Sequence, residues 1–332
     1  MSFTVTLQPS GRRFLVEHGE TLLEAALRSG ISLDYKCING TCGECRARIV
    51  SGEVGAIAQH DFVIREVDKR QGVVLLCRTV PATDLVVEAL VARTPEDIPR
   101  QTVITRVDRI DEPTPQVRII QLRTPRSQTL RFLAGQTASL EIDGVASSTR
   151  AIASCPCNGM FLQFHIRRND DDPFARHVFE ALRLRDCITV AGPQGRFILD
   201  EESTRPLIFL ARGTGFAPIK SLIEQCFNLE LTQSVTLYWD SDFARQPYLA
   251  NYCRSWEDAF DNFRYVPMVD ETRRRTPSEQ LAQVARCICS DHPDLERSDL
   301  YASIGESNFE TAQGLLLEGD LPANRLFIDR SL

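Results

Sequence analysis

The sequence contains no long hydrophobic run and no excess of positive charge. No apolar stretch among its 332 residues reaches the roughly 18–20 residues of a membrane-spanning helix, so we expect neither a membrane anchor nor a membrane partner. The opening MSFTVTLQPSGRRF lacks the charged and then apolar profile of a secretory signal, which predicts a cytoplasmic location. The formal net charge of −7 argues against nucleic acid as a partner.

Internal repeats and the usual patterns of hydrolytic enzymes are also absent. No Ser–His–Asp arrangement or carboxylate pair stands out, and we expect His165 and His177 to have packing or surface roles. The apolar fraction of 43% and the charged fraction of 25% are ordinary for a globular protein. The length is too great for one hydrophobic core and predicts two or three domains.

Cysteine, in contrast, is abundant, with 11 in the chain. An odd number in a cytoplasmic protein argues against a disulfide framework, so we expect metal ligands, redox groups or small buried side chains. Two C-x-C pairs, one at residues 155–157 and one at 287–289, have no obvious further ligands and are expected to be structural.

Four other cysteines have the spacing of an iron–sulfur ligand set. Cys37, Cys42 and Cys45 form C-x4-C-x2-C in CINGTCGEC, and Cys77 follows in VVLLCRT. This is the spacing of plant-type [2Fe–2S] ligands. Zinc is the alternative, but zinc sites usually pair C-x2-C motifs or histidines, and no histidine lies in this loop. The sequence therefore predicts a [2Fe–2S] cluster on these four residues.

The residues around the cluster loop predict a small mixed domain. Gly40 and Gly43 allow tight turns that bring backbone N–H groups close to the sulfurs. FTVTLQ and RRFLVEH alternate as a hairpin, TLLEAALRSG has a capping box and ends at a glycine, and VVLLC is typical of a buried strand. This order resembles the plant-type ferredoxin fold over residues 1–92, which implies an α+β β-grasp domain.

The sequence pattern of the rest of the chain changes twice, after the linker and near residue 200. Residues 93–101 are polar, contain two prolines and are expected to be a linker. Residues 102–200 carry many short alternating strands and one helix, which favours an antiparallel β-barrel. Residues 201–332 alternate strand and helix patterns, which predicts an α/β doubly wound parallel sheet.

Three segments of this part resemble the ferredoxin–NADP reductase superfamily. They are AGQTASLEI, the GPQGRF segment that begins at Gly192, and the GTGFAP loop of Gly213, Thr214 and Gly215. The resemblance implies that the barrel binds FAD, with Gly192 at the domain junction, and that the last domain binds NADH or NADPH. In the GTGFAP loop, glycines would let the backbone approach a diphosphate at a helix N-terminus. Reductase components of bacterial oxygenases and reductases of deoxysugar biosynthesis share this order.

The flavin segment departs from the Arg-x-Tyr-Ser/Thr pattern of that superfamily. If the sequence IAS fixes the register, Ser148 replaces the arginine and Arg150 replaces the flavin-stacking aromatic residue. If Arg150 fixes the register, Ile152 replaces the aromatic residue and Ala153 the hydroxyl. The candidate flavin-binding residues are therefore Arg150, Ala151, Ile152, Ala153 and Ser154.

A second flavin motif is also altered. Asp172 stands at the helix start where the superfamily uses Gly-x-x-Ser to hold the FAD diphosphate. Its carboxylate caps a helix well but would repel a diphosphate, and Arg176 could offset part of that repulsion.

The nicotinamide segment has three features of its own. Arg212 precedes GTG where the superfamily has glycine. Ser303, in Ser303-Ile304-Gly305-Glu306, is the counterpart of a cysteine near the hydride-transfer site and is the candidate catalytic residue. Asp240 could bind a ribose 2′-OH and favour NADH over NADPH, or it could be a solvated strand end.

Two functions follow. The first is an NAD(P)H-dependent reductase that passes electrons through FAD and the cluster to an acceptor protein such as an oxygenase component. FAD is needed because the cluster accepts one electron at a time and cannot accept a hydride. The alternative is a ferredoxin-type carrier whose reductase-like half lacks FAD and NAD(P)H activity.

Overall fold

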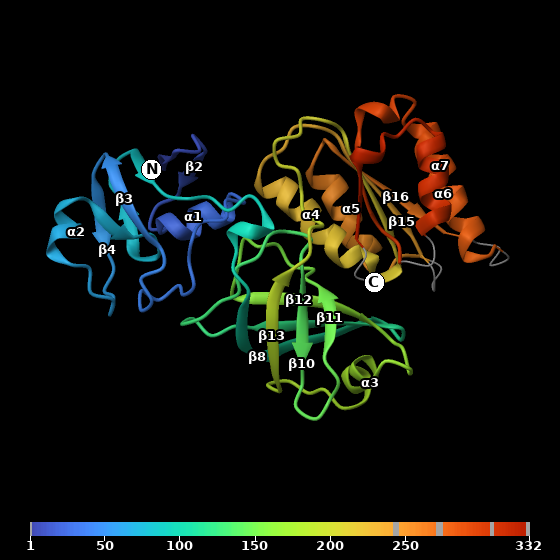
Figure 1. The fold of residues 1–332 in the computed structure, drawn as a ribbon, viewed down its shortest axis with the longest axis horizontal. Helices are drawn as coiled ribbons and strands as arrows, with labels where there is room; N and C mark the ends of the chain where they lie inside the picture. Colours follow the sequence, from blue (N-terminus) through green and yellow to red (C-terminus); the bar gives the residue numbers. More distant parts are fainter. Residues whose placement is uncertain (1, 242–245, 270–274, 306–308, 330–332) are drawn as a thin grey trace.

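The structure is a computed structural model that describes residues 2–241, 246–269, 275–305 and 309–329. Three parts follow one another along the chain (Figure 1). The first, drawn in blue, lies at one end of the molecule, the green barrel lies below the centre, and the yellow-to-red part lies at the other end.

The first part is the β-grasp domain that the sequence predicts. Its main sheet has the order β2-β1-β7-β3-β5, with β1 antiparallel to β2 and parallel to β7, and β4 pairs with β6 in a separate ribbon. The elements are β1 (Phe3–Gln8), β2 (Arg13–Val16), α1 (Leu22–Arg28), β3 (Arg46–Ser51), β4 (Val54–Ile57), α2 (Glu66–Arg70), β5 (Val73–Leu75), β6 (Thr79–Pro81) and β7 (Leu85–Glu88).

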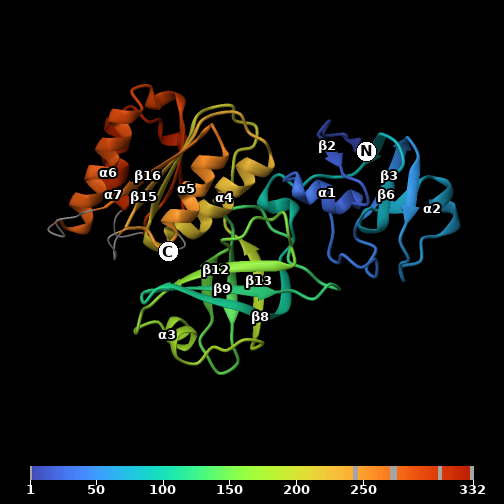
Figure 2. The same cartoon turned by 180° about the vertical axis from the view of Figure 1, so that it is seen from behind.

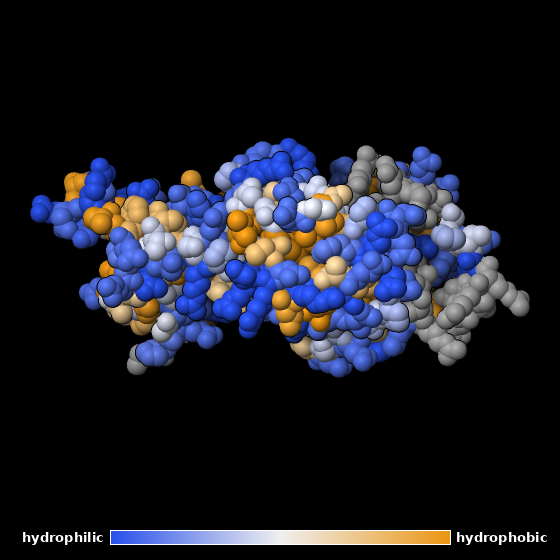
Figure 3. Space-filling model, turned by 90° about the horizontal axis from the view of Figure 1, so that it is seen from below, coloured by the Kyte–Doolittle hydropathy of each residue, from blue (hydrophilic) through white to orange (hydrophobic). Residues whose placement is uncertain are grey.

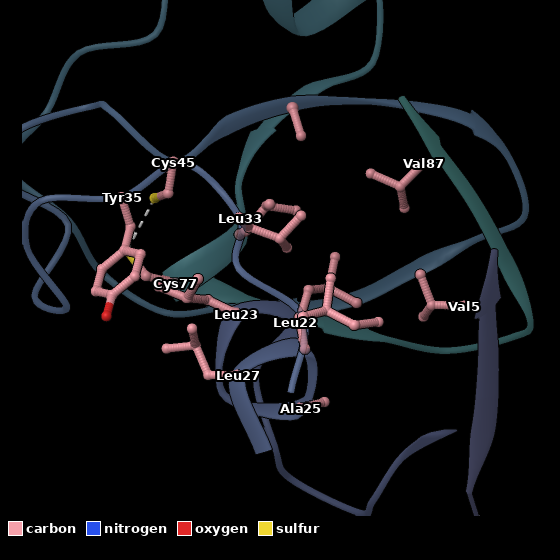
Figure 4. Close-up of a cluster of buried hydrophobic side chains, with 14 of the residues drawn as sticks. Val5, Leu22, Leu23, Ala25, Leu27, Leu33, Tyr35, Cys45, Cys77 and Val87 are labelled. Atoms are coloured by element: carbon pink, nitrogen blue, oxygen red, sulfur yellow. Dashed lines mark hydrogen bonds between the residues drawn. The ribbon is translucent and has the colours of Figure 1, made fainter. Parts of the chain in front are cut away.

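Helix α1 begins and ends as predicted. The Thr21 side chain accepts from the Glu24 N–H, and the Glu24 side chain accepts from the Thr21 N–H, which satisfies two N–H groups at the helix start. Gly30 follows the helix end with φ of +71°, a conformation that favours glycine. The apolar face of α1 packs on the sheet, where Leu22 and Leu23 join Val5 and Val87 in the core (Figure 4).

The second part is an antiparallel, nearly closed barrel. Its six strands have the order β11-β10-β13-β8-β9-β12, and the Ala153 N–H, just after β11, donates to the Gln163 carbonyl of β12 at 2.7 Å. This bond joins the two end strands of the sheet, so the predicted barrel is confirmed. The elements are β8 (Gln101–Thr114), β9 (Val117–Arg123), β10 (Thr137–Glu141), β11 (Ser148–Ala151), β12 (Phe161–Arg167), α3 (Pro173–Glu180) and β13 (Cys187–Gln194).

The third part is a parallel sheet with helices on both faces, as expected (Figure 2). The strand order is β16-β15-β14-β17-β18; α4 and α5 cover one face, and α6 and α7 cover the other. The elements are β14 (Leu207–Arg212), α4 (Phe216–Asn228), β15 (Val235–Asp240), α5 (Ala250–Ala259), β16 (Phe263–Met268), α6 (Pro277–Asp291), β17 (Asp299–Ser303), α7 (Phe309–Glu318) and β18 (Leu326–Ile328).

The segment expected to be a linker packs against the barrel and the third part. It forms a short helical turn at Pro95–Asp97, and Ile98 is buried with Leu133. Arg93 pairs with Glu202, and Glu96 pairs with Arg196. The domain limits at residues 92, 101 and 200 stay a prediction, although β8 already starts at Gln101.

In the described residues, no helix has both the length and the apolar character needed to cross a membrane. The face shown in Figure 3 is mainly hydrophilic, with apolar areas near its middle. Large apolar side chains that the barrel exposes include Ile104 and Leu184.

Candidate functional site: a cysteine cluster and two nucleotide loops

The four predicted ligand cysteines converge in two pairs. The Cys42 N–H donates to Cys37 Sγ at 3.4 Å, and the Cys37 and Cys42 thiols are hydrogen-bonded to each other. Cys45 Sγ lies 3.3 Å from Cys77 Sγ, in the short helical turn that follows β5 (Figure 4). Cys37 also acts electrostatically on both Cys45 and Cys77, so the two pairs are neighbours.

Hydrogen bonds lower the pKa of one cysteine in each pair, Cys37 in the first and Cys45 in the second. Burial acts to raise the pKa of the Cys37 thiol, but hydrogen bonds from Cys42, Thr41 and the Asn39 backbone outweigh it and lower that pKa to about 7. Hydrogen bonding with Cys77 lowers the pKa of Cys45, and the same contact raises the pKa of Cys77. Burial and the contact with Cys37 raise the pKa of Cys42, so each pair contains one sulfur whose thiolate is favoured.

Two glycines give the loop its shape. Gly40 and Gly43 have φ of +79° and +77°. A Cβ on Gly40 would lie 2.6 Å from the Cβ of His60, and one on Gly43 would overlap the ring of Phe62. The Gly40 N–H also donates toward the Cys77 sulfur. Both positions thus require glycine for conformation and for space.

This donor set fits a binuclear iron–sulfur core. Within the described residues, no three His, Cys, Asp or Glu side chains gather as they would around a single metal ion. Two neighbouring cysteine pairs are instead what a [2Fe–2S] cluster with four thiolate ligands requires. Tyr35 lies beside the sulfurs (Figure 4), and burial raises its pKa to about 12.

The flavin-type strand presents Arg150 to the start of α3. The Arg150 guanidinium pairs with the Asp172 carboxylate, which also accepts from the N–H groups of Phe174 at 2.9 Å and Ala175 at 3.3 Å. A cation and a helix N-terminus together form an anion cradle. The charge of this cradle suits a diphosphate, but in the structure the Asp172 carboxylate occupies it. The predicted offset by Arg176 is therefore supplied by Arg150 instead.

The burial pattern limits which side chains of this strand could contact a flavin. Ile152 is fully buried in the barrel core, so its side chain is unavailable to stack on a flavin outside the barrel. Arg150 and Ser148 are both partly exposed and lie two residues apart in β11, so they share one face of the strand. Ala151 and Ala153 are buried against Ala217 of α4. In either register, the strand thus offers no aromatic ring to stack on a flavin.

The glycine loop of the third part joins β14 to α4 as predicted. Gly213, Thr214 and Gly215 form a short helical turn, and Gly215 lies so close to β17 that a Cβ there would overlap the Ser303 carbonyl. Gly192 sits in β13 beside Ala138, where a Cβ would come within 3.0 Å. Both glycines therefore permit close packing of backbone.

Asp240 is buried rather than solvated. It is 0% exposed, its carboxylate pairs with Arg212 at 3.0 Å, and it accepts from the Gln280 amide of α6. Arg212 also donates to the Pro277 carbonyl at 3.0 Å. The expected solvated strand end is wrong, and a ribose hydroxyl reaches Asp240 only if these contacts open.

Ser303 lies at the end of β17, next to the glycine loop. Its side chain is fully buried and donates to Asp329 Oδ2 at 2.9 Å. Ser303 is therefore a buried side chain directly beside Gly215 of the glycine loop. Glu306, the last residue of the same motif, lies outside the described residues.

The sequence did not predict the direct contacts between the barrel and the third part. His165 of β12 hydrogen-bonds to the Tyr248 hydroxyl at 2.7 Å, and burial lowers the pKa of His165 well below its usual value. Lys220 Nζ donates to the Ala153 carbonyl at 3.2 Å, and Ser221 Oγ donates to the Ser154 carbonyl at 2.8 Å. The available signal was a lysine directly after the apolar first turn of α4. His177 is half-buried on α3.

The cluster loop also contacts the barrel directly. The Ile38 N–H, next to Cys37, donates to the Arg126 carbonyl at 3.0 Å, and the Thr129 N–H donates to the Lys36 carbonyl at 2.8 Å. Arg131 pairs with Asp34. These bonds hold the cysteine-bearing end of the first part against the second.

Comparison with known proteins agrees with this layout. The 2Fe-2S iron-sulfur cluster binding domain family matches residues 5–82. The CDP-6-deoxy-L-threo-D-glycero-4-hexulose-3-dehydrase reductase of Yersinia pseudotuberculosis is 31% identical over 329 residues, which cover 99% of this chain and 98% of the relative. The chain belongs to this family of reductases. The reductase component of phenol 2-monooxygenase from a Pseudomonas species is 28% identical and covers 82% of this chain and 77% of the relative.

Solved structures show the same fold over most or all of the chain. The Amycolatopsis cytochrome P450 reductase has a TM-score of 0.62 at 24% identity and covers 99% of this chain and 98% of that one. Phthalate dioxygenase reductase has a TM-score of 0.57 at 15% identity, over 72% and 70% of the two chains. With the family matches, the chain is an oxidoreductase that carries a 2Fe-2S iron-sulfur cluster binding domain.

Proposed function

We propose that this reductase delivers its electrons to a separate dehydrase that acts on a nucleotide-linked deoxysugar. The observation that carries the proposal is the end-to-end match with a dehydrase reductase, at 31% identity over 99% of this chain and 98% of the relative. Reductase components of oxygenases are less similar to this chain: that of phenol 2-monooxygenase is 28% identical over 82% of this chain, and that of propane 2-monooxygenase from a Gordonia species is 25% identical over 98%. An oxygenase acceptor, which the sequence also suggests, is the competing outcome of the test.

The exit for electrons is the cluster end of the molecule. In the proposal, Cys37 and Cys42 hold one iron and Cys45 and Cys77 hold the other, as their pairing suggests. Backbone N–H groups such as that of Glu44, 3.4 Å from Cys42 Sγ, stabilise the extra negative charge of the reduced state.

The entry for electrons is the carboxyl edge of β14 and β17. We assign the NAD(P)H diphosphate to the loop of Gly213, Thr214 and Gly215, where glycines and the start of α4 allow close approach. Ser303 would then lie next to the nicotinamide, behind Gly215. Asp240 takes part only after its contact with Arg212 opens, so the choice between NADH and NADPH depends on that pair.

FAD, when bound, converts the hydride equivalent of NAD(P)H into single electrons that the cluster can accept. Arg150 and the N–H groups at the start of α3 are the groups that would hold its diphosphate, with the Asp172 carboxylate as their internal competitor. Within the run from Ala151 to Ser154, the partly exposed Ser154 would line the flavin from the barrel side, and Lys220 holds the run at the Ala153 carbonyl. The alternative of an inactive reductase half is disfavoured by the family match.

An electron-delivery assay without oxygen tests the proposal. The FAD- and iron-loaded protein is mixed with NADH and, in separate runs, with the CDP-6-deoxy-L-threo-D-glycero-4-hexulose-3-dehydrase or with a phenol 2-monooxygenase oxygenase component. We expect faster NADH oxidation with the dehydrase. Faster oxidation with the oxygenase would overturn the assignment of the acceptor, and no NADH oxidation with any acceptor would overturn the proposed entry site.

A further inference from the structure

A disulfide lies in the loop that connects β11 to β12. Cys155 and Cys157 are bonded to each other, although the odd number of cysteines argues against a disulfide framework. This loop follows directly on Ser154, the last of the candidate flavin-binding residues. The disulfide therefore lies between the expected flavin strand and the rest of the barrel.

Two of the cavities that Cys157 borders lead to different redox sites. One cavity, of about 260 Å³, is shared with the cluster ligand Cys77 and with Leu23 and Leu27 of α1. The other, of about 430 Å³, lies between the barrel and helices α4 and α5 and is also lined by Ser154 and Lys220. The disulfide thus separates the cluster side of the barrel from the side that faces the third part.

The two sulfurs have different surroundings. Cys157 is partly exposed, whereas Cys155 is buried, with 7% exposure. Cys155 Sγ accepts from the Asn228 side-chain N–H of α4 at 2.8 Å and from the Cys157 N–H at 3.0 Å. When the S–S bond opens at the exposed Cys157, Cys155 leaves as a thiolate, and these two donors stabilise its charge. The arrangement favours reduction through Cys157.

A purely structural role explains this bond poorly. It closes a loop of only three residues, and the stabilisation from a disulfide grows with the length of the loop that it closes. The loop is already held by the Thr124 hydroxyl, which donates to the Gly159 carbonyl at 3.0 Å, and by the Thr124 N–H, which donates to the Met160 carbonyl at 2.9 Å.

We propose that Cys155 and Cys157 form a reversible two-electron redox site that NAD(P)H reduces alongside the cluster. The balanced change is Cys–S–S–Cys + NAD(P)H + H⁺ → 2 Cys–SH + NAD(P)⁺. The S–S bond breaks, each sulfur gains one electron and one proton, and the nicotinamide gives up its hydride. The proposal rests on the proposed function only in taking NAD(P)H as the reductant.

Thiol labelling without oxygen tests the site. The FAD-loaded holoprotein is alkylated with N-ethylmaleimide before or after NADH and digested with trypsin. Cleavage after Arg150 and Arg167 gives the peptide 151–167, which contains both cysteines and no other. We expect no label before NADH and two labels after it. The peptide 287–297 carries the other C-x-C pair, whose cysteines are free thiols, and serves as the internal control, with equal labelling in both samples.

A variant tests the role assigned to Asn228. Asn228→Ala removes the side-chain donor to Cys155, and we expect labelling after NADH to appear about tenfold more slowly, the loss of one hydrogen bond to a developing thiolate. Asn251→Ala on the exposed face of α5 is the matched control and should label at the normal rate.

The outcomes separate this inference from the proposed function. Cluster reduction by NADH with peptide 151–167 still unlabelled overturns the redox site and leaves the reductase intact. Two labels before any reductant also overturn it. An unchanged labelling rate in Asn228→Ala overturns the leaving role of Cys155. Reduction of neither the cluster nor the disulfide overturns the proposed function itself.

Discussion

The cluster loop and the nucleotide cradles of this reductase differ in what their charged groups contact. In the cluster loop, backbone N–H groups donate to the sulfurs of Cys37 and Cys42, which are predicted ligands of the metal core. In the reductase half, the cations already hold carboxylates of the chain, Arg150 with Asp172 and Arg212 with Asp240. The difference suggests that cluster binding is built in, whereas nucleotide binding requires internal ion pairs to open.

The largest expected effect comes from removing a cluster ligand. Cys77→Ser leaves Cys45 without its partner, so iron and acid-labile sulfide should fall to near zero. Iron and sulfide analysis of protein purified without oxygen measures this. Cys187→Ser, at an exposed cysteine, should retain full content. Retention of the cluster in Cys77→Ser would contradict the claim that Cys77 is one of its ligands.

A smaller but still large effect comes from the loop backbone. Gly43→Ala strains a residue at φ of +77° and places a methyl group in the Phe62 ring, so cluster content should fall to less than about half. Gly11→Ala has nearly the same φ, +71°, and open space around it. Equal cluster content in the two variants would show that crowding by Phe62 is unimportant.

Opening the buried pair at the nicotinamide edge should destabilise the third part. Asp240→Asn leaves the buried Arg212 guanidinium without its counter-charge, which costs about 3 kcal/mol of unfolding free energy. Urea unfolding followed by tryptophan fluorescence measures this, because both tryptophans, Trp239 and Trp256, lie in this part. Asp258→Asn, on exposed α5, should change little. A loss below about 1 kcal/mol would mean that the pair is only weakly coupled to the fold.

The smallest effect concerns flavin affinity. Asp172→Asn keeps a helix cap but removes the negative charge from the Arg150 cradle, so FAD should bind about tenfold more tightly. Titration of the flavin-free protein with FAD, followed by flavin fluorescence, gives the dissociation constant. Asp171→Asn, next to the cradle but exposed, is the control. Weaker binding in Asp172→Asn would mean that Asp172 supports the cradle rather than competing in it.

Local patterns were sufficient to predict the fold. The hairpin of β1 and β2, the Thr21–Glu24 capping box and the glycine loop after β14 each depend on residues close together in sequence. The cluster ligands could be predicted for the same reason, since three of the four lie within one short loop.

Contacts between distant elements could not be predicted in this way. Arg150 and Asp172 were each identified, but their pairing depends on how α3 packs beside β11. The burial of Asp240 depends on the side-by-side register of β14 and β15, which places Arg212 opposite it. The bond from Ser303 to Asp329 likewise needs the chain end to lie along β17. The periodicity of apolar residues and the spacing of motifs carry no information on such contacts between distant elements.

The most direct test is whether NADH reduces the cluster within the isolated, FAD-saturated protein. Electron paramagnetic resonance of a sample frozen after anaerobic mixing reports the reduced cluster. We predict that NADH produces the reduced-cluster signal and that Cys77→Ser gives none. A protein that contains iron, sulfide and bound FAD, whose cluster responds to dithionite but never to NADH, would contradict the account.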